Sequence, residues 1–176
     1  MDATQLDFPD SVFDAVICQL GLMLFSKPDQ SLREMLRVVK PAGRVSCLVQ
    51  GSPQKMLFTS ILNQSMLRHA PHLKIPGAPG LYDFAPEGIL DKAFAETGLV
   101  QIQSRRIAGT FQFASIEEYW KIMSAGAGRT GVLLKSLPEQ VRQAVYEDVF
   151  QKVSEFKTES GTGIPYEFVM CSAIKP

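Results

Sequence analysis

Residues 12–50 read VFDAVICQLGLMLFSKPDQSLREMLRVVKPAGRVSCLVQ, and this stretch determines the class of the fold. Its first nine residues, 12–20, are a short apolar run rich in β-branched side chains, which is typical of a buried strand. A Pro-Asp pair then favours a helix start, and apolar residues recur at helical spacing over 31–40. A Pro-Ala-Gly turn ends that helix, and 44–50 is a second apolar run. Two strands joined through a helix predict a βαβ unit with parallel strands and a right-handed crossover.

The rest of the chain extends this α/β pattern. The sequence predicts a helix over 56–69, a second helix that begins at Pro86 and ends at Gly98, and a strand over 99–113. Two further helices begin at the capping boxes Ser115–Glu118 and Ser136–Glu139. A last strand over 166–175 follows a Gly-Thr-Gly turn. We expect that last strand to return antiparallel. We interpret 1–176 as a single domain in which 51–83, rich in Pro and Gly, and the helical stretch 115–160 are lids or substrate-side insertions.

The composition is that of an ordinary globular domain. The 176 residues carry no net charge, 45% are hydrophobic and 20% are charged, which is enough apolar side chain for a sizeable core. Charges of both signs are mixed without a basic block, so nucleic acid is not an expected partner. The longest apolar stretch is too short for a bilayer and no secretory signal opens the chain, so we expect a cytoplasmic protein with no membrane partner.

The cysteines and histidines give no metal-binding signature. Cys18, Cys47 and Cys171 each lie in an apolar run and none belongs to a C-x-x-C pair, so we interpret them as buried thiols in a reducing compartment. His69 and His72 have no neighbouring cysteine. No metal site is therefore predicted.

The segment from Asp2 to Arg44 carries a more specific pattern. It contains, in order, Asp-Ala, Leu-Asp-Phe-Pro-Asp, Phe-Asp-Ala-Val, Gly-Leu-Met-Leu-Phe, Leu-Arg-Glu-Met-Leu-Arg-Val and Lys-Pro-Ala-Gly-Arg. With these elements at their usual spacing, the chain resembles the class I S-adenosylmethionine-dependent methyltransferases of the quinone-biosynthesis type and their small-molecule relatives. The resemblance implies a partial Rossmann-like sheet with helices on both faces, an antiparallel last strand and a helical insertion near the C-terminus. The motifs match closely over residues 1–50, and in the rest of the chain only the order of the elements matches.

The resemblance implies S-adenosylmethionine as the cofactor, and it points to the residues that hold it. Asp2 would accept a hydrogen bond from the adenine amino group, and the backbone N–H of Ala3 would donate to the ring. The methionine part would lie at the carboxyl end of the first strand, where open α/β sheets bind ligands, against Cys18, Gln19, Leu20 and Gly21. Each of these two polar residues also has a structural explanation: Asp2 as a solvated terminal residue, and Gln19 as a polar residue that caps a strand end. The motif around Asp2 favours the cofactor role for that residue.

One residue departs from the family pattern. Ala42 stands where the family's Lys-Pro-Gly-Gly-Arg turn has a glycine. We expect this exchange to be harmless unless the position needs a positive φ.

No catalytic residue is assigned, because methyl transfer from a sulfonium needs mainly alignment and the exclusion of water. A base is needed only where the acceptor must lose a proton, and the candidates for a base or a substrate contact are His69, Tyr82, Tyr119 and Tyr166. Each also has a structural explanation that we prefer, as a solvated histidine or a packed tyrosine. Tyr119, Trp120 and Met123 either cover an apolar substrate or form the buried face of their helix.

The family's Gly-x-Gly-x-Gly cofactor loop has no counterpart in the pattern. The Gly-x-Gly stretches at 125–131 and 160–165 do not follow a buried strand and open a helix, so they are interpreted as flexible connections. We therefore expect an N-terminally truncated family member that binds the cofactor weakly or is inactive. Without a further neighbour, strand 12–20 is an exposed sheet edge, through which we expect a homo-oligomer, most simply a homodimer.

Three functions compete at this point. The leading hypothesis is transfer of a methyl group from S-adenosylmethionine to a small-molecule acceptor, with an apolar or quinone-like acceptor favoured by the aromatic residues of the insertion. The alternative is a non-enzymatic assembly or interaction module that retains the fold. A nucleotide-dependent oxidoreductase is disfavoured because the sequence has no dinucleotide fingerprint.

Overall fold

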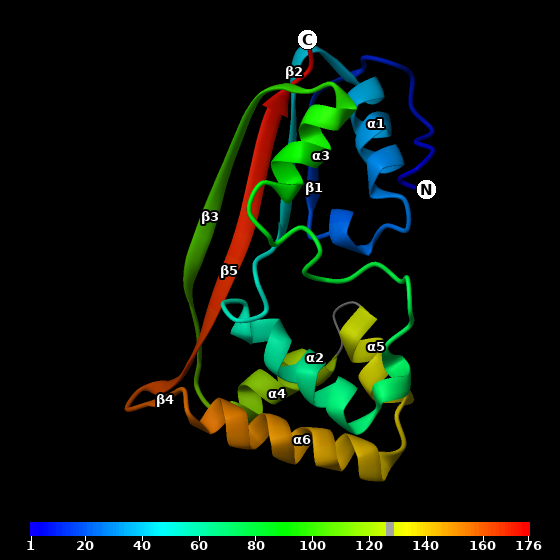
Figure 1. The fold of residues 1–176 in the computed structure, drawn as a ribbon. Coiled ribbons are helices and arrows are strands. Elements are labelled where there is room, and N and C mark those ends of the chain that lie inside the picture. The colour runs from blue at the N-terminus through cyan, green and yellow to red at the C-terminus, as the bar shows by residue number, and fades with distance from the viewer. Residues whose placement is uncertain (126–128) are drawn as a thin grey trace. The chain divides into compact units, whose positions relative to one another are not determined.

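The structure is a computed structural model that describes residues 1–125 and 129–176, and the chain divides into two compact units. Unit 1 contains Met1–Ser52, Ala78–Ile107 and Glu167–Pro176, and unit 2 contains Pro53–Gly77 and Ala108–Tyr166. Figure 1 labels the helices and strands of both units. Two long strands contribute residues to each unit, namely β3 (Val100–Phe113) and β5 (Gly161–Ile174).

The remaining elements belong to one unit each. Unit 1 has β1 (Phe13–Gln19), the short 3-10 helix η1 (Leu22–Leu24), α1 (Pro28–Val38), β2 (Val39–Gln50) and α3 (Ile89–Thr97). Unit 2 has α2 (Leu57–His69), η2 (Pro71–Leu73), α4 (Ile116–Ala125), α5 (Arg129–Ser136), α6 (Glu139–Ser154) and β4 (Lys157–Thr158). The helices of unit 2 thus come from the two stretches that the sequence marked as insertions.

The strands of unit 1 have the predicted directions. The sheet order is β1-β2-β5-β3, and β4 pairs with β5. β1 runs parallel to β2, with Ala15 opposite Arg44 and Gln19 opposite Leu48. β5 runs antiparallel to β2. The predicted α/β class, the parallel βαβ unit and the antiparallel last strand are therefore confirmed.

The core of unit 1 lies between one face of the sheet and the helices α1 and α3. Side chains that alternate along the strands meet apolar side chains of both helices in a single cluster, which includes Leu32, Met35, Val45, Cys47, Leu90, Phe94, Val169 and Cys171. On the opposite face of β1, Ile17 is 75% exposed. Within unit 1 both helices therefore share one face, whereas the sequence predicted helices on both. The crossover places α1 against the face that carries the cluster, and α3 packs beside α1 (Figure 1).

The C-terminal end of α1 is held by the end of the chain. The Nζ of Lys175 donates to the carbonyl of Val39 at 2.8 Å and to that of Arg37 at 3.3 Å. A cation at this place stabilises the carbonyls that a helix leaves unpaired at its C-terminus. Residues 41–43, predicted as a turn, lie inside β2, where backbone hydrogen bonds run from Ala42 to Lys175 and from Lys175 to Gly43.

Ala42 occupies a position where the backbone is left-handed. Its φ is 61°, a region that glycine enters without strain and that L-residues with a Cβ atom rarely adopt. Position 42 therefore needs a positive φ, and the exchange of glycine for alanine there is not harmless. The family's glycine at this position has a conformational reason, and Ala42 carries a cost.

Unit 2 is built around a second apolar cluster. Val145, Val149 and Val153 recur at helical spacing on α6 and are buried where α6 packs on α2. Tyr119 of α4 is completely buried in the same cluster. Trp120 and Met123 pack against it and are partly buried.

Two local predictions in unit 2 need correction. The first capping box is present in part: the N–H of Glu118 donates to the Oγ of Ser115, but the carboxylate of Glu118 accepts from Ala114. The second is wrong, because the Oγ of Ser136 donates back to Leu133 and Pro138 occupies the N-cap of α6. A serine hydroxyl that bonds its own preceding helix is not available to cap the next one.

The two glycine stretches also need comment. The segment 160–165 was interpreted as a flexible connection before the last strand. It is the beginning of β5, which starts at Gly161 and pairs there with β4. Within the other stretch, 125–131, residues 126–128 lie outside the described part of the chain.

Candidate functional site

The carboxyl end of β1 turns sharply at Leu20. The φ of Leu20 is 56°, and its N–H donates to the carbonyl of Leu48 on β2 at 2.8 Å. A bulky residue in the left-handed region costs energy, and such positions are found most often at functional sites. The backbone after Gln19 is therefore held in a strained, half-buried turn at the end of the strand where ligands of open α/β sheets bind.

Gly21 follows this turn, and its small size is required by its neighbours. A Cβ atom there would lie 3.0 Å from the Sγ of Cys18 and 3.3 Å from the ring of Phe25. Its φ is −103°, so crowding rather than a left-handed backbone excludes a side chain. The next two residues, Leu22 and Met23, are buried and anchor the turn in the core of unit 1.

Asp2 forms a tight turn with Thr4. Its Oδ1 accepts hydrogen bonds from the backbone N–H and the hydroxyl of Thr4, both at 2.8 Å. These hydrogen bonds lower the pKa of Asp2 below its ordinary value, so the carboxylate is ionised at neutral pH. Asp2 is exposed and Ala3 is half-buried within the same turn. An ionised acceptor beside a backbone N–H is the arrangement that the adenine edge requires.

The Asp2 turn and the Leu20 turn lie at the same end of α1. Gln30, in the first turn of α1, donates from its Nε2 to the carbonyl of Thr4 at 3.0 Å. The chain reaches the start of α1 from Leu20 through η1, and Lys27 at that start acts electrostatically on Asp2. The structure thus brings both groups of predicted cofactor residues to one end of unit 1.

Cys18 has an unusual environment for a buried thiol. The thiol of Cys47 on β2 is hydrogen-bonded to its sulfur and, with the backbone N–H groups of Gly21 and Leu22, lowers the pKa of Cys18 to about 7 against the opposing effect of burial. The same contact, together with burial, raises the pKa of Cys47 well above its ordinary value. The predicted burial of all three cysteines is confirmed.

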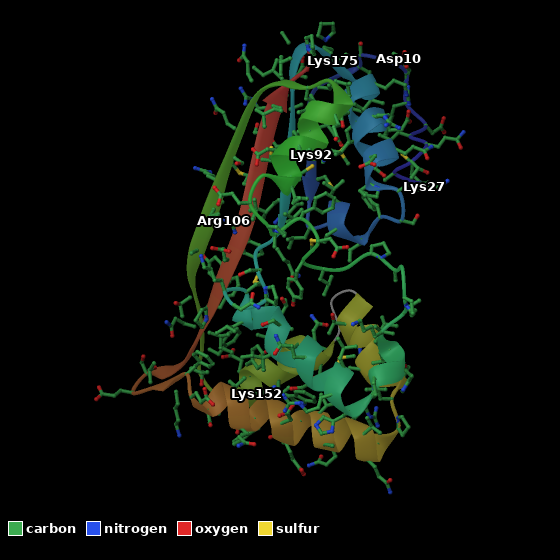
Figure 2. All side chains as sticks on the ribbon, viewed as in Figure 1. Asp10, Lys27, Lys92, Arg106, Lys152 and Lys175 are labelled. Carbon is green, nitrogen blue, oxygen red and sulfur yellow. The ribbon has the colours of Figure 1, made fainter. Side chains whose placement is uncertain are left out.

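An ion pair between an exposed arginine and a buried glutamate lies beside the carboxyl end of β2. Arg106 of β3, labelled in Figure 2, donates from Nη1 to Glu167 at 2.9 Å and from Nη2 to the carbonyl of Ala85 at 2.8 Å. The side chain of Glu167 is 4% exposed, and Gly51 packs directly on it. This pair was not among the residues predicted from the sequence. The available signal was a single glutamate inside the apolar run of the last strand.

The candidate bases are divided between the two units, with Tyr82 in unit 1 and His69, Tyr119 and Tyr166 in unit 2. His69 lies on α2, with its Nε2 3.9 Å from Asp148 of α6, in a charged cluster on unit 2. The hydroxyl of the buried Tyr119 donates to the carbonyl of Phe58 at 2.9 Å, so the preferred explanation as a packed tyrosine is confirmed for this residue. Tyr166 packs its ring on Phe111 with centroids 4.3 Å apart. Tyr82 is half-buried in unit 1.

The structure also bears on metals and membranes. Over residues 1–125 and 129–176, no group of three His, Cys, Asp or Glu side chains is arranged to hold a metal ion. No helix in that part of the chain is long and apolar enough to cross a membrane.

Comparisons with known sequences agree with the N-terminal pattern. Residues 1–47 match the family described as "Methyltransferase domain". The demethylmenaquinone methyltransferase of Deinococcus radiodurans is 36% identical over 97 residues, which cover 54% of this chain and 39% of that protein. The enzyme of the same name from Mycobacterium tuberculosis strain H37Rv is 34% identical over 90 residues, 50% of this chain and 38% of that protein. The chain therefore matches about two fifths of the length of these relatives.

Comparisons with solved structures concern the fold. A putative methyltransferase from Bacillus halodurans superposes with a TM-score of 0.57 at 19% identity, covering 100% of this chain and 76% of that one. Phosphoethanolamine N-methyltransferase 2 from Haemonchus contortus, in complex with phosphomonomethylethanolamine and S-adenosylhomocysteine, superposes with a TM-score of 0.51 at 14% identity over 100% of this chain and 36% of that one. At these identities the likeness shows a shared architecture.

Proposed function

We propose that this chain is part of a class I S-adenosylmethionine-dependent methyltransferase and that its residues form the adenine and methionine sides of a site for S-adenosylmethionine. In the whole protein this site would serve methyl transfer to a small-molecule acceptor. The observation that carries the proposal is the meeting of the Asp2 turn and the Leu20 turn at one end of α1.

Each residue of the site has a part that its geometry supports. The ionised carboxylate of Asp2 would accept from the adenine amino group, and the N–H of Ala3 would donate to the ring. The strained backbone at Gln19–Gly21 would face the methionine part, with Gly21 permitting close approach. When bound, the cofactor supplies an activated methyl group on its sulfonium. The chain's residues then contribute binding, alignment and exclusion of water.

The acceptor is proposed to be an apolar, quinone-like molecule. The two relatives named above are demethylmenaquinone methyltransferases, and aromatic side chains gather in unit 2. Phe58, Phe111 and Tyr166 are in ring contact there, with centroid distances of 4.3 and 4.7 Å. Transfer of a labelled methyl group to a prenylated naphthoquinol, compared with a polar amine acceptor, tests this. Labelling of the amine alone would contradict the choice of acceptor.

Isothermal titration calorimetry tests the cofactor site. S-adenosylmethionine and S-adenosylhomocysteine should both bind the chain, and Asp2→Asn should weaken both, because a neutral amide is the poorer acceptor for the adenine amino group. Asp7→Asn is the matched control, since Asp7 is an exposed carboxylate in the same segment and outside the site. Equal affinities of the two variants, or no heat with either ligand at millimolar concentration, would contradict the site.

We also propose that the chain forms a homodimer through the edge of β1. β1 ends the sheet order, and its outward-facing Ile17 is 75% exposed. An unpaired edge with apolar side chains tends to pair with another strand. Light scattering behind a sizing column should give a dimer for the wild type and a monomer for Ile17→Lys. Ile75→Lys, at an exposed position of unit 2, should leave the dimer intact. A wild-type monomer at micromolar concentration would exclude this assembly.

The exposed edge also favours a second function, a non-enzymatic assembly module that keeps the fold. Such a module would dimerise through β1 and bind no cofactor. Calorimetry and light scattering on one sample therefore separate the two functions. The three free thiols support the cytoplasmic setting proposed for both.

A further inference from the structure

The three cysteines form a single row across the sheet of unit 1. Cys18 on β1 stands opposite Cys47 on β2, and Cys47 stands opposite Cys171 on β5. They come from strands distant in the sequence, and all three face the same apolar core. We propose that Cys18 is a peroxide-sensitive thiol and that Cys47 is its resolving partner, so that mild oxidation joins β1 to β2 through a disulfide.

The backbone geometry permits this bond. Neighbouring strands lie about 4.8 Å apart. Disulfides join residues whose Cα atoms are roughly 4.4–6.8 Å apart. Cys18 and Cys47 are direct cross-strand partners, and both side chains are buried in the same apolar cluster. Little movement of the strands is therefore needed.

Cys18 differs from the other two thiols in reactivity and access. It is 8% exposed, against 1% for Cys47 and 0% for Cys171. Hydrogen bonds from Cys47 and from the N–H groups of Gly21 and Leu22 favour its thiolate, whereas burial raises the pKa of Cys171 to about 12.

The chemistry requires hydrogen peroxide as the oxidant. The Cys18 thiolate attacks one peroxide oxygen, so that an S–O bond forms, the O–O bond breaks and hydroxide leaves; sulfur loses two electrons and peroxide gains them. The sulfur of Cys47 then attacks the sulfenic sulfur. An S–S bond forms, the S–O bond breaks, and the hydroxyl leaves as water with the proton of Cys47. A small thiol reductant restores both thiols.

Peptide mapping tests the pairing directly, because the three cysteines fall in separate tryptic peptides, residues 1–33, 45–55 and 158–176. After brief treatment of the folded chain with hydrogen peroxide, the cross-linked peptide should join 1–33 to 45–55. It should be equally abundant in Cys171→Ser, the matched control, and absent from Cys18→Ser. In Cys47→Ser, dimedone should trap a sulfenic acid on Cys18. None of these readouts depends on binding of S-adenosylmethionine.

Two results would overturn the proposal. One is a bridge between 45–55 and 158–176, and the other is Cys18 left reduced at a peroxide concentration that oxidises free cysteine. Iodoacetamide labelling of the untreated wild type gives a measurement that needs no variant. Cys18 should be alkylated at least tenfold faster than Cys171 in the folded chain and at an equal rate in urea, whereas equal rates in the folded chain would contradict the difference in reactivity.

Discussion

Arg37 and Glu34 of α1 form a two-pronged ion pair, in which Nε donates to Oε1 and Nη2 donates to Oε2, both at 2.8 Å. The pair holds the N-terminal segment. Glu34 accepts from the N–H of Leu6, and Arg37 donates to the carbonyls of Leu6 and Phe8 and to Asp10, which is labelled in Figure 2. The Glu-x-x-Arg spacing in the sequence thus attaches the segment that begins with Asp2 to α1.

Loss of Arg37 should loosen this segment more than loss of its exposed neighbour Arg33. Arg37→Ala removes the donor of five hydrogen bonds, so we expect a melting temperature lowered by several degrees and earlier proteolysis of residues 2–10. Arg33→Ala on the same helix should melt like the wild type. Equal melting temperatures for Arg37→Ala and Arg33→Ala would show that the hydrogen bonds of Arg37 do not stabilise the chain. Calorimetric titration should also show weaker S-adenosylmethionine binding for Arg37→Ala alone.

The same pair gives the chain a defined acid sensitivity. Hydrogen bonds from Arg37 and from the N–H of Leu6 lower the pKa of Glu34 from 4.5 to about 2 in the folded chain. A carboxyl whose pKa falls on folding contributes stability that is complete above the unfolded pKa and is lost as the pH falls through the folded one. The contribution of Glu34 should therefore decline between pH 4.5 and pH 2.

Melting temperatures of wild type and Glu34→Gln, measured from pH 6 to pH 2, check this. The difference between the two should be largest above pH 4.5 and should shrink toward pH 2. Glu87→Gln, at an exposed carboxyl in the same unit, is the control and should track the wild type throughout. A Glu34→Gln difference that does not change with pH would show that the carboxylate is not the titrating group.

Two substitutions at positions with a left-handed backbone should change the free energy of unfolding in opposite directions. Ala42→Gly relieves a residue held at φ 61° and should stabilise the chain by up to about 1 kcal/mol. Gly98→Ala puts a Cβ atom on the C-cap of α3 at φ 96° and should destabilise it by about 1 kcal/mol. Urea unfolding measures both. The same sign for the two variants would contradict the backbone explanation.

The ion pair of Arg106 with the buried carboxylate of Glu167 should be sensitive to loss of the arginine. Arg106→Ala leaves the carboxylate of Glu167 buried without its guanidinium and should cost about 2–4 kcal/mol. Arg105→Ala, one residue earlier on the same strand, removes an exposed side chain and should change stability by less than about 0.5 kcal/mol. Urea midpoints separate the two outcomes, and equal midpoints would mean that the pair is not needed for stability.

Elements defined by neighbours in the sequence were predictable. The βαβ unit over 12–50 follows from periodicity and turn residues, and the antiparallel last strand agrees with what the family resemblance implies. The capping box at Ser136 failed because its hydroxyl had a closer acceptor within α5. The start of β5 at Gly161 was missed because pairing with β4 extends a strand through glycines that would otherwise form a loop.

The sequence by itself determined the α/β class and the N-terminal resemblance to methyltransferases, because both depend on residue type at short spacing. The tertiary structure alone decided which distant residues meet. Register placed Cys18, Cys47 and Cys171 in one row, and the strands brought Arg106 to Glu167. It also decided that Leu20 and Ala42 are left-handed, since their φ angles are imposed by hydrogen bonds to Leu48 and Lys175. Such contacts join residues far apart along the chain, and no local pattern encodes them.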